Sequence, residues 1–139
     1  MAVRVVRLGT PRIAGEGTRI GTVRRPPRGV PKAEFASRNW YDVWFPNLAP
    51  SAATMKLGQQ ADTPAKWSAF ARKYKAEMAA PHAKHDLELL AVLSRAADFS
   101  VGCYCEREDR CHRSILKQLL IENGAVLAVP KGNEPAPKP

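Results

Sequence analysis

The chain has 139 residues, of which 45% are hydrophobic, and it carries a formal net charge of +9. A chain of this length and composition is expected to form one globular domain with a substantial core, which excludes a wholly disordered protein. No apolar run is long enough for a signal peptide or a membrane span, so we expect a cytoplasmic protein that does not bind membranes.

Positive charge is concentrated in the first 32 residues, which contain eight arginines and lysines and one acid. Such a surplus attracts polyanions, and arginine can bind a phosphate group with two hydrogen bonds. We therefore expect a nucleotide or a nucleic acid as the partner, although a basic surface without a specific partner would give the same composition. No aromatic residue is interleaved with the arginines of the 24–32 loop as a stacking surface for bases.

The first half of the chain favours short strands and loops. Alternating apolar residues predict strands over residues 3–8 and 18–23. Three prolines in the segment RRPPRGVPK, residues 24–32, predict a rigid and exposed cationic loop. Residues 40–46 (WYDVWFP) favour a strand whose aromatic side chains belong to the core. The alternative is an exposed aromatic patch that binds a protein partner.

The next segment favours two helices. Thr63 is a good N-cap and Pro64 suits the first helical position, so a helix is expected to start there. A second helix follows Pro81, and we interpret its His82 and His85 as solvated first-turn residues rather than metal ligands. The side chains that this second helix is expected to bury are Leu89, Leu90, Leu93 and Ala97.

Residues 99–129 predict a strand–helix–strand unit. The apolar segment 99–105 is the first strand, residues 112–123 are the helix, and residues 125–129 are the second strand. This order predicts an α/β fold, with a single domain over residues 1–130 and a compact, mostly parallel sheet flanked by helices in a Rossmann-like three-layer arrangement. Residues 131–139 are expected to be a disordered tail rich in proline and lysine.

All three cysteines lie at the turn between the predicted strand 99–105 and the predicted helix 112–123. Ligands of open α/β sheets bind beside the carboxyl ends of the strands, and the amino end of a helix attracts anions. We therefore expect the functional site at this turn. Three interpretations of its residues remain open.

The first interpretation is a metal or haem site, whose ligands would be Cys103, Cys105, Cys111 and His112. The side chains of Cys103 and Cys105 share one face of a strand, whereas those of Cys111 and His112, which are neighbours, are expected to diverge. Structural zinc sites usually have about two to four residues between paired ligands. The spacing therefore favours a site without a metal.

The second interpretation is a thiol-based enzyme or redox protein, in which Cys105 is the nucleophile and His112 its base. Arg110 or Arg113 would then bind an anionic group of the substrate. The acids of the segment EREDR, residues 106–110, oppose this interpretation, because negative charge raises the pKa of a nearby thiol.

The third interpretation is that the cysteines are small buried hydrophobes, while His112 and Arg113 are exposed at the start of the helix and bind a ligand. Weighing the three, we predict an anionic ligand, a nucleotide or a nucleic acid, at this turn. The residues predicted to bind it are Arg24, Arg28 and Arg113, with His112 to transfer a proton and Cys105 as the reactive thiol.

A pattern of arginines precedes the cysteine turn and comprises Arg19, Arg24, Arg28 and Gly29. Together with the C-x-C…C-H-R turn, it resembles the family called domain of unknown function 488, whose members include YeaO-like proteins. The family pattern is R-x-x-V-D-R-x-W-P-R-G, and here Val23 and Pro26 take the Asp and Trp positions. The likeness spans roughly residues 3–129 and continues through Trp44, Pro50, Ser51, Phe70, Tyr74 and Glu77.

This resemblance implies a fold and a site, but no reaction. YeaO-like relatives keep a histidine at the place of His112 and lack the cysteines. The resemblance therefore favours His112 over the cysteines as a functional residue.

Overall fold

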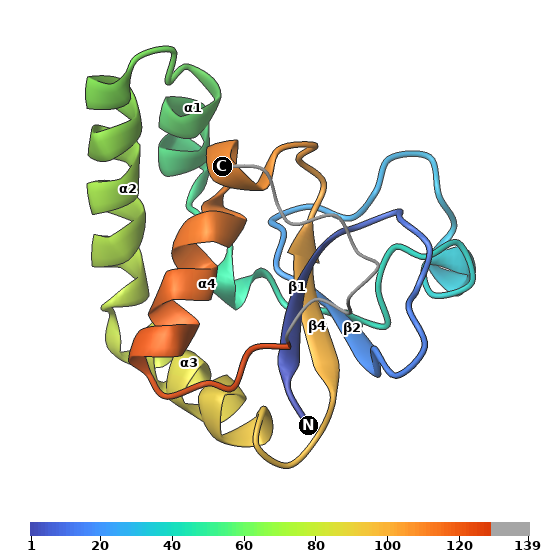
Figure 1. Cartoon of the computed structure of the whole chain (residues 1–139). Coiled ribbons are helices and arrows are strands. Elements are labelled where there is room, and N and C mark those ends of the chain that lie inside the picture. The colour runs from blue at the N-terminus through green and yellow to red at the C-terminus, as the bar shows by residue number, and fades with distance from the viewer. Residues whose placement is uncertain (129–139) are drawn as a thin grey trace.

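The computed structural model describes residues 1–128 of the chain, so the predicted tail over residues 131–139 lies outside the described residues. Its strands form one parallel sheet in the order β1-β4-β2-β3. Figure 1 shows the helices on one side of this sheet and long connections on the other. The predicted α/β class, with a parallel sheet flanked by helices, is confirmed. The strands are β1 (Val3–Arg7), β2 (Thr18–Gly21), β3 (Val43–Trp44) and β4 (Phe99–Cys103).

β4 is a central strand, and all five of its residues are buried, as the continuous apolar run predicts. Phe99 pairs in parallel with Val3 of β1 and with Thr18 of β2. The two neighbouring strands approach closely at Gly102, where an added Cβ would lie 2.7 Å from the carbonyl oxygen of Val6. A glycine here therefore permits the pairing of β1 with β4 just before the cysteines begin.

The helices are α1 (Ala52–Gln59), α2 (Pro64–Met78), α3 (Pro81–Leu93) and α4 (His112–Glu122). Thr63 caps α2 as predicted, because its hydroxyl accepts a hydrogen bond from the N–H of Lys66 at 3.2 Å. The sequence did not predict α1, although Ser51 caps it in the same way through the N–H of Thr54.

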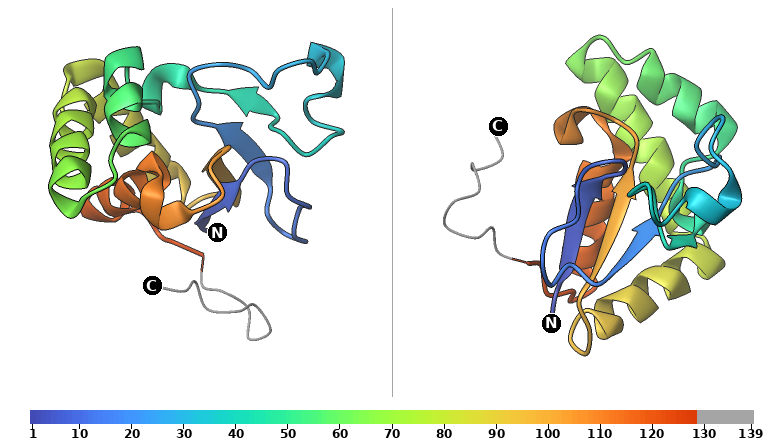
Figure 2. Two further views of the ribbon diagram at one scale, coloured as in Figure 1. Left: turned by 90° about the horizontal axis from the view of Figure 1, so that it is seen from above. Right: turned by 90° about the vertical axis from the view of Figure 1, so that its right-hand side faces the viewer.

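The two faces of the sheet are covered differently (Figure 2). The helices enclose the main core on one face, where Leu48, Phe70, Tyr74 and Leu116 are buried with the strands. On the other face, the connections around β2 and β3 take the place of an α-helix. A second hydrophobic cluster comprises Leu8, Val23, Tyr41, Cys103 and Cys111. The third layer is thus a loop layer, and this leaves its surface uneven.

Two of the predicted strands are much shorter than expected. The aromatic segment 40–46 contributes only the two residues of β3, because Pro46 begins a short 3₁₀ helix. In the segment predicted as a final strand, 125–129, the described residues form a single parallel bridge between Val3 and Leu127. Backbone hydrogen bonds of 2.8 Å join Val3 to Val126 and to Ala128 on this side.

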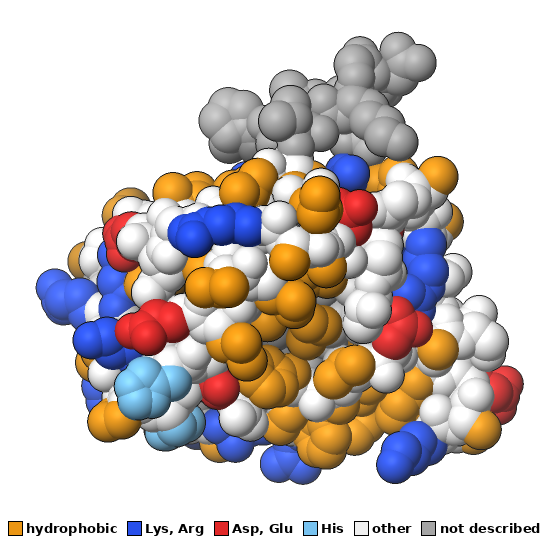
Figure 3. Space-filling view, turned by 90° about the horizontal axis from the view of Figure 1, so that it is seen from below, with side chains coloured by type: hydrophobic (Ala, Val, Ile, Leu, Met, Phe, Trp, Pro, Cys, Tyr) orange, Lys and Arg blue, Asp and Glu red, His pale blue; other side chains and the backbone are white. Residues whose placement is uncertain are grey.

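The predicted burial of α3 is partly wrong. Leu90 is 6% exposed, but Leu89 is 65% exposed and Leu93 also faces solvent. The buried stripe of α3 instead runs through Ala83, Leu87, Leu90 and Ala91. Figure 3, which views the molecule from below, shows hydrophobic side chains gathered on the surface that lies at the bottom of Figure 1, beside α3.

A buried ion pair ties the loop after β1 to the sheet. The guanidinium of Arg19 donates two hydrogen bonds to the carboxylate of Glu16, at 2.8 and 3.0 Å, and a third at 2.8 Å to the carbonyl oxygen of Asn39. Ser100 of β4 donates to the same carboxylate at 2.8 Å. Burial alone would raise the pKa of Glu16, but the hydrogen bonds from Arg19 and Ser100 lower it. Arg19 therefore belongs to the protein interior and not to the cationic surface.

Candidate functional site

The cysteines lie where β4 ends and α4 begins, at the carboxyl edge of the parallel sheet. Cys103 is the last residue of β4, and Cys111 is the N-cap of α4, whose sulfur accepts the N–H of Arg113 at 3.5 Å. Both are buried, and only Cys105 is exposed. The N–H of Cys105 donates a hydrogen bond of 3.4 Å to the sulfur of Cys103. The backbone after β4 therefore turns back toward the thiol of Cys103.

The three thiols interact, and the pKa of the exposed one, Cys105, is lowered. Hydrogen bonds from Cys103 and then Cys111 hold the pKa of Cys105 well below its usual value, and the positive charge of Arg113 acts in the same direction. The pKa of Cys103 is raised, chiefly because it donates to Cys105. For Cys111, the hydrogen bond with Cys103 lowers the pKa, whereas the hydrogen bond with Cys105 and burial raise it. The result is a pKa of Cys111 raised to about 11. Of the three thiols, Cys105 is therefore the one that loses its proton most readily.

The acids of the 106–110 segment do not oppose this lowering of the pKa as the sequence suggested. Each of them has a basic partner. Asp109 pairs with Arg107 at 2.7 Å, and the two glutamates pair more loosely with bases elsewhere in the chain. Their charges are therefore largely compensated, and the thiol donors lower the pKa of Cys105.

His112 and Arg113 were expected at the surface, and this expectation is wrong. Both side chains are buried at the start of α4. The Nε2 atom of His112 lies 2.8 Å from the carbonyl oxygen of Thr22, and its Nδ1 atom lies 3.8 Å from the sulfur of Cys111. Burial lowers the pKa of His112 to about 4, so the ring is neutral at pH 7.

Arg113 holds the segment that carries Cys105. Its Nη2 atom donates a hydrogen bond of 2.7 Å to the carbonyl oxygen of Cys105. Its Nε atom is buried and has no hydrogen-bond partner among the described residues. The guanidinium thus fixes the backbone of Cys105 and places a positive charge beside it.

Cys105 opens onto a pocket of about 430 Å³, which we call the cysteine pocket. Cys111 and His112 line it from α4, and Trp67 and Phe70 line it from α2. Arg107 and Arg110 from the connecting loop, with Met55, Gly58, Gln59, Ala61 and Asp62 from α1 and the turn after it, complete the wall. The helical pattern predicted that Trp67 and Phe70 share one face of α2, but nothing local in the sequence indicated that this face meets the thiols.

Two of the arginines predicted to bind the ligand lie outside the cysteine pocket. Arg24 donates to the carbonyl oxygen of Pro50 at 2.9 Å and lines a different hollow, beside Glu77. Arg28 lines a larger pocket on the other side of the β4 terminus. The structure therefore brings Cys105, His112 and Arg113 together, but not Arg24 or Arg28.

A metal ion would find three converging ligands here. The ligand atoms of Cys103, Cys111 and His112 all lie within 4.8 Å of one another, so the expected divergence of Cys111 and His112 is wrong. Since Cys105 is hydrogen-bonded to both other thiols, a third sulfur lies close to this set. In the part of the chain that the structure describes, no helix is long and apolar enough to cross a membrane.

These features define a parallel α/β domain with three thiols and a buried histidine at the carboxyl end of a central strand. The chain belongs to the DUF488-N3a family, described as the active DUF488-N3 subclade, whose model matches residues 3–124. This match confirms the resemblance to the domain of unknown function 488 family. No curated protein and no solved structure matches the chain.

Proposed function

We propose that this protein is a cytoplasmic, cysteine-dependent enzyme whose substrate carries an anionic group, such as the phosphate of a nucleotide or a nucleic acid. One observation carries the proposal: the sulfur of Cys105 is exposed at the wall of the cysteine pocket, beside two buried thiols and Arg113, which lower its pKa. The other two cysteines are buried, so a substrate would reach Cys105 first. A low pKa combined with exposure is the usual mark of a reactive cysteine.

Positive charge around the cysteine pocket supports an anionic substrate. Arg110 lines the pocket, and the amino end of α4 adds a partial positive charge, whereas Arg107, which also lines it, is paired with Asp109. Arg110 uses one of its N–H donors in a contact of 3.3 Å with the carbonyl oxygen of Ala61. A guanidinium has five such donors, so this contact leaves Arg110 able to bind an anion.

In the proposed reaction, the thiolate sulfur of Cys105 attacks an electrophilic atom of the substrate. A covalent bond forms between the two atoms, and the bond to the leaving group breaks with its electron pair going to the leaving group. Water then attacks the substrate atom, its second proton is released, and the thiolate is restored. Because the neighbouring thiols lower the pKa of Cys105, we propose that it needs no base, and we assign to His112 the positioning of Cys111 rather than proton removal.

Alkylation by iodoacetamide, followed by peptide mass spectrometry, tests the proposal. Cys105 should be alkylated at pH 5.5 at nearly its rate at pH 8, whereas an ordinary thiol slows by about two orders of magnitude over this range. AMP or inorganic phosphate should slow the reaction of Cys105, and Cys105→Ser should abolish labelling at this position. A rate that rises with pH as in free cysteine would exclude the thiolate and with it the proposed enzyme.

The second candidate is a metal centre built from the same residues. It is favoured by the convergence of Cys103, Cys111 and His112 and by the contact of His112 with Thr22. That contact occupies Nε2 and leaves Nδ1 for a metal, which is a common arrangement around zinc. Zinc titration against a chromophoric chelator separates the candidates. One zinc per chain, lost in Cys111→Ala and protecting Cys105 from alkylation, would replace the enzyme proposal.

A further inference from the structure

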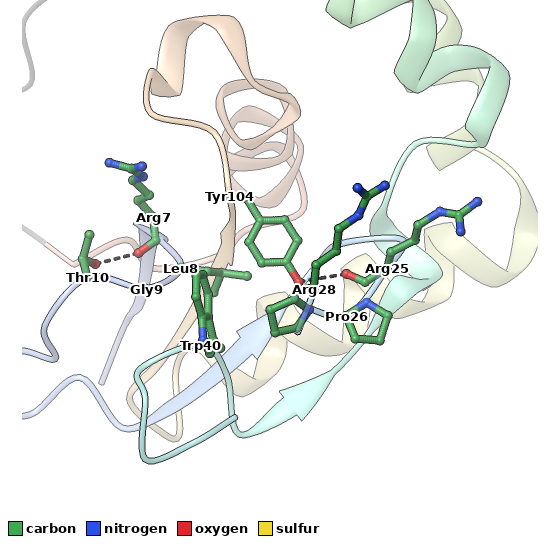
Figure 4. A pocket seen from close by; sticks show the side chains of 10 residues that line it. Arg7, Leu8, Gly9, Thr10, Arg25, Pro26, Arg28, Trp40 and Tyr104 are labelled. Carbon is green, nitrogen blue, oxygen red and sulfur yellow. Dashed lines mark hydrogen bonds between the residues drawn. The ribbon is translucent and has the colours of Figure 1, made fainter. Parts of the chain in front are cut away.

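A second pocket is larger than the cysteine pocket. It has a volume of about 850 Å³ and lies on the other side of the end of β4, so that Tyr104 lines one pocket and its neighbour Cys105 the other. We call it the arginine–aromatic cleft. Its lining residues are Arg7, Leu8, Gly9, Thr10, Arg25, Pro26, Pro27, Arg28, Trp40 and Tyr104. Figure 4 shows this cleft from close by.

The aromatic side chains of the cleft are firmly held. The rings of Trp40 and Tyr104 meet edge to face, with centroids 5.8 Å apart and an angle of 73° between their planes. The hydroxyl of Tyr104 donates a hydrogen bond of 2.8 Å to the carbonyl oxygen of Arg25. Trp40 packs against Gly9, where an added Cβ would lie 2.9 Å from the indole ring. These contacts fix a ring surface beside the cationic loop.

The arginines of the cleft are available to a ligand. Within residues 1–128, neither Arg25 nor Arg28 has an ion pair or a hydrogen bond for its guanidinium, and Arg7 has only a loose pair of 3.8 Å with the exposed Glu106. In Figure 4 the side chains of Arg25 and Arg28 extend on one side of the Tyr104 ring and that of Arg7 on the other. Two unpaired guanidinium groups on one side of an aromatic ring, with a loosely paired one on the other side, suit an anion that also carries a planar group.

The backbone of the cleft is stiff on the arginine side. Pro26 and Pro27 lie between Arg25 and Arg28, and each proline fixes its own φ. A loop that is already ordered loses little conformational freedom when a ligand binds. The two arginines are therefore presented to the ligand at low entropic cost.

From this geometry we infer that the arginine–aromatic cleft is a second binding site, which takes the base and phosphate of a nucleotide unit. The arginines hold the phosphate, and the base packs on the rings of Tyr104 and Trp40. The volume of the cleft lies within the usual range for sites that hold molecules of this size. The inference does not depend on the chemistry of Cys105, which faces the other pocket.

Isothermal titration calorimetry with AMP, ribose 5-phosphate and inorganic phosphate tests this inference. AMP should bind at least about tenfold more tightly than ribose 5-phosphate, because only AMP has a base to stack. Arg28→Gln should weaken AMP binding by about tenfold or more, since a charge-assisted contact is lost. Arg72→Gln, on the exposed side of α2, makes the same change of charge away from the cleft and should bind AMP like the wild type.

The aromatic part of the site has its own variant. Tyr104→Leu should weaken AMP binding, because one of the two rings that hold the base is lost, and should leave ribose 5-phosphate binding unchanged. Thermal melting confirms that the variant is folded. Equal affinities for AMP and ribose 5-phosphate in the wild type would overturn the inference. Equal losses in Arg28→Gln and Arg72→Gln would overturn it as well.

Two further measurements identify the source of the nucleotide and separate this site from the thiol. A short single-stranded oligo(dT) that binds more tightly than AMP, with an affinity that falls steeply with salt, identifies a nucleic acid, and the reverse order identifies a free nucleotide. Cys105→Ser should retain AMP binding at this cleft. Loss of AMP binding in Cys105→Ser would overturn the assignment of two separate sites.

Discussion

The Nε2 atom of His112 lies 2.8 Å from the carbonyl oxygen of Thr22, and this contact sets the protonation of the ring. A carbonyl oxygen only accepts hydrogen bonds, so Nε2 carries the proton of the neutral imidazole. Nδ1 then carries the lone pair and lies 3.8 Å from the sulfur of Cys111. A residue that the sequence predicted as an exposed proton donor is thus a buried neutral ring that joins α4 to the end of β2.

The pH dependence of stability should report this buried ring. Burial lowers the pKa of His112 to about 4, below its value in the unfolded chain, so the unfolded state binds the proton more readily between pH 4 and 6.5. Stability therefore rises with pH through this window, and His112 contributes an amount on the order of 3 kcal/mol that is lost as pH falls to 4.

Urea denaturation at pH 7 and pH 4.5 measures this loss. His112→Gln should lose less stability between the two pH values than the wild type, because glutamine does not titrate. His82→Gln, which changes an exposed histidine of α3, should keep the wild-type dependence. Parallel behaviour of His112→Gln and the wild type would show that the ring is not neutral in the folded state.

The thiol donors around Cys105 can be separated by substitution. Cys103→Ala removes the first of them and should raise the pKa of Cys105, whereas Cys103→Ser keeps a hydroxyl donor and should leave the pKa low. The pH midpoint of iodoacetamide alkylation, measured for each variant, checks this order. If the alanine and serine variants had the same midpoint, a hydrogen bond from residue 103 would not be the cause of the lowered pKa of Cys105.

Arg113 should affect Cys105 through charge as well as through the backbone. Arg113→Met keeps most of the side-chain volume but removes both the positive charge and the hydrogen bond to the carbonyl oxygen of Cys105. We expect the alkylation midpoint of Cys105 to move to higher pH, in the same direction as in Cys103→Ala. A midpoint unchanged in a folded Arg113→Met variant would limit Arg113 to a structural role.

Breaking the buried Glu16–Arg19 pair should be costly. Glu16→Gln leaves the guanidinium of Arg19 buried without its counter-charge, which costs about 3–5 kcal/mol in comparable pairs. The half-exposed pair of Arg12 and Asp42 has a similar length of 2.8 Å, and Asp42→Asn provides the matched control. We expect about 1 kcal/mol for that variant in denaturant titrations, because solvent screens the pair.

Two adjacent leucines of α3 should differ in how much stability their truncation costs. Leu90→Ala creates a cavity in the main core and should cost about 2–5 kcal/mol. Leu89→Ala removes a side chain that already faces solvent and should change stability by less than about 0.5 kcal/mol. Comparable losses in the two variants, measured by thermal or urea unfolding, would contradict the observed orientation of α3.

Local signals in the sequence predicted those parts of the fold that depend on a few neighbouring residues. Thr63 and Pro64 define the start of α2 by capping alone, and the buried run of β4 is apolar at nearly every position. The sequence did not show which face of α3 is buried, because Leu89, Leu90 and Leu93 are equally hydrophobic. Only packing decides which of them is buried.

The site required contacts that no local pattern encodes. Arg19 counted toward the cationic surplus, yet it is fully buried against Glu16. The loop with Arg28 has no aromatic residue of its own, and its ring surface comes from Trp40 and Tyr104, which are far apart in the chain. Such convergence depends on the order of the strands in the sheet, which the sequence pattern leaves open.

The pairing of β1 also has a consequence for how the chain is made. Val3 has Phe99 on one side and Leu127 on the other, so both neighbours of this first strand are translated long after it. During synthesis, β1 stays unpaired until almost all of residues 3–124, the region that matches the family, have left the ribosome. Truncation near residue 120 should therefore leave β1 open on one side, and aggregation of nascent chains should depend on this exposed edge.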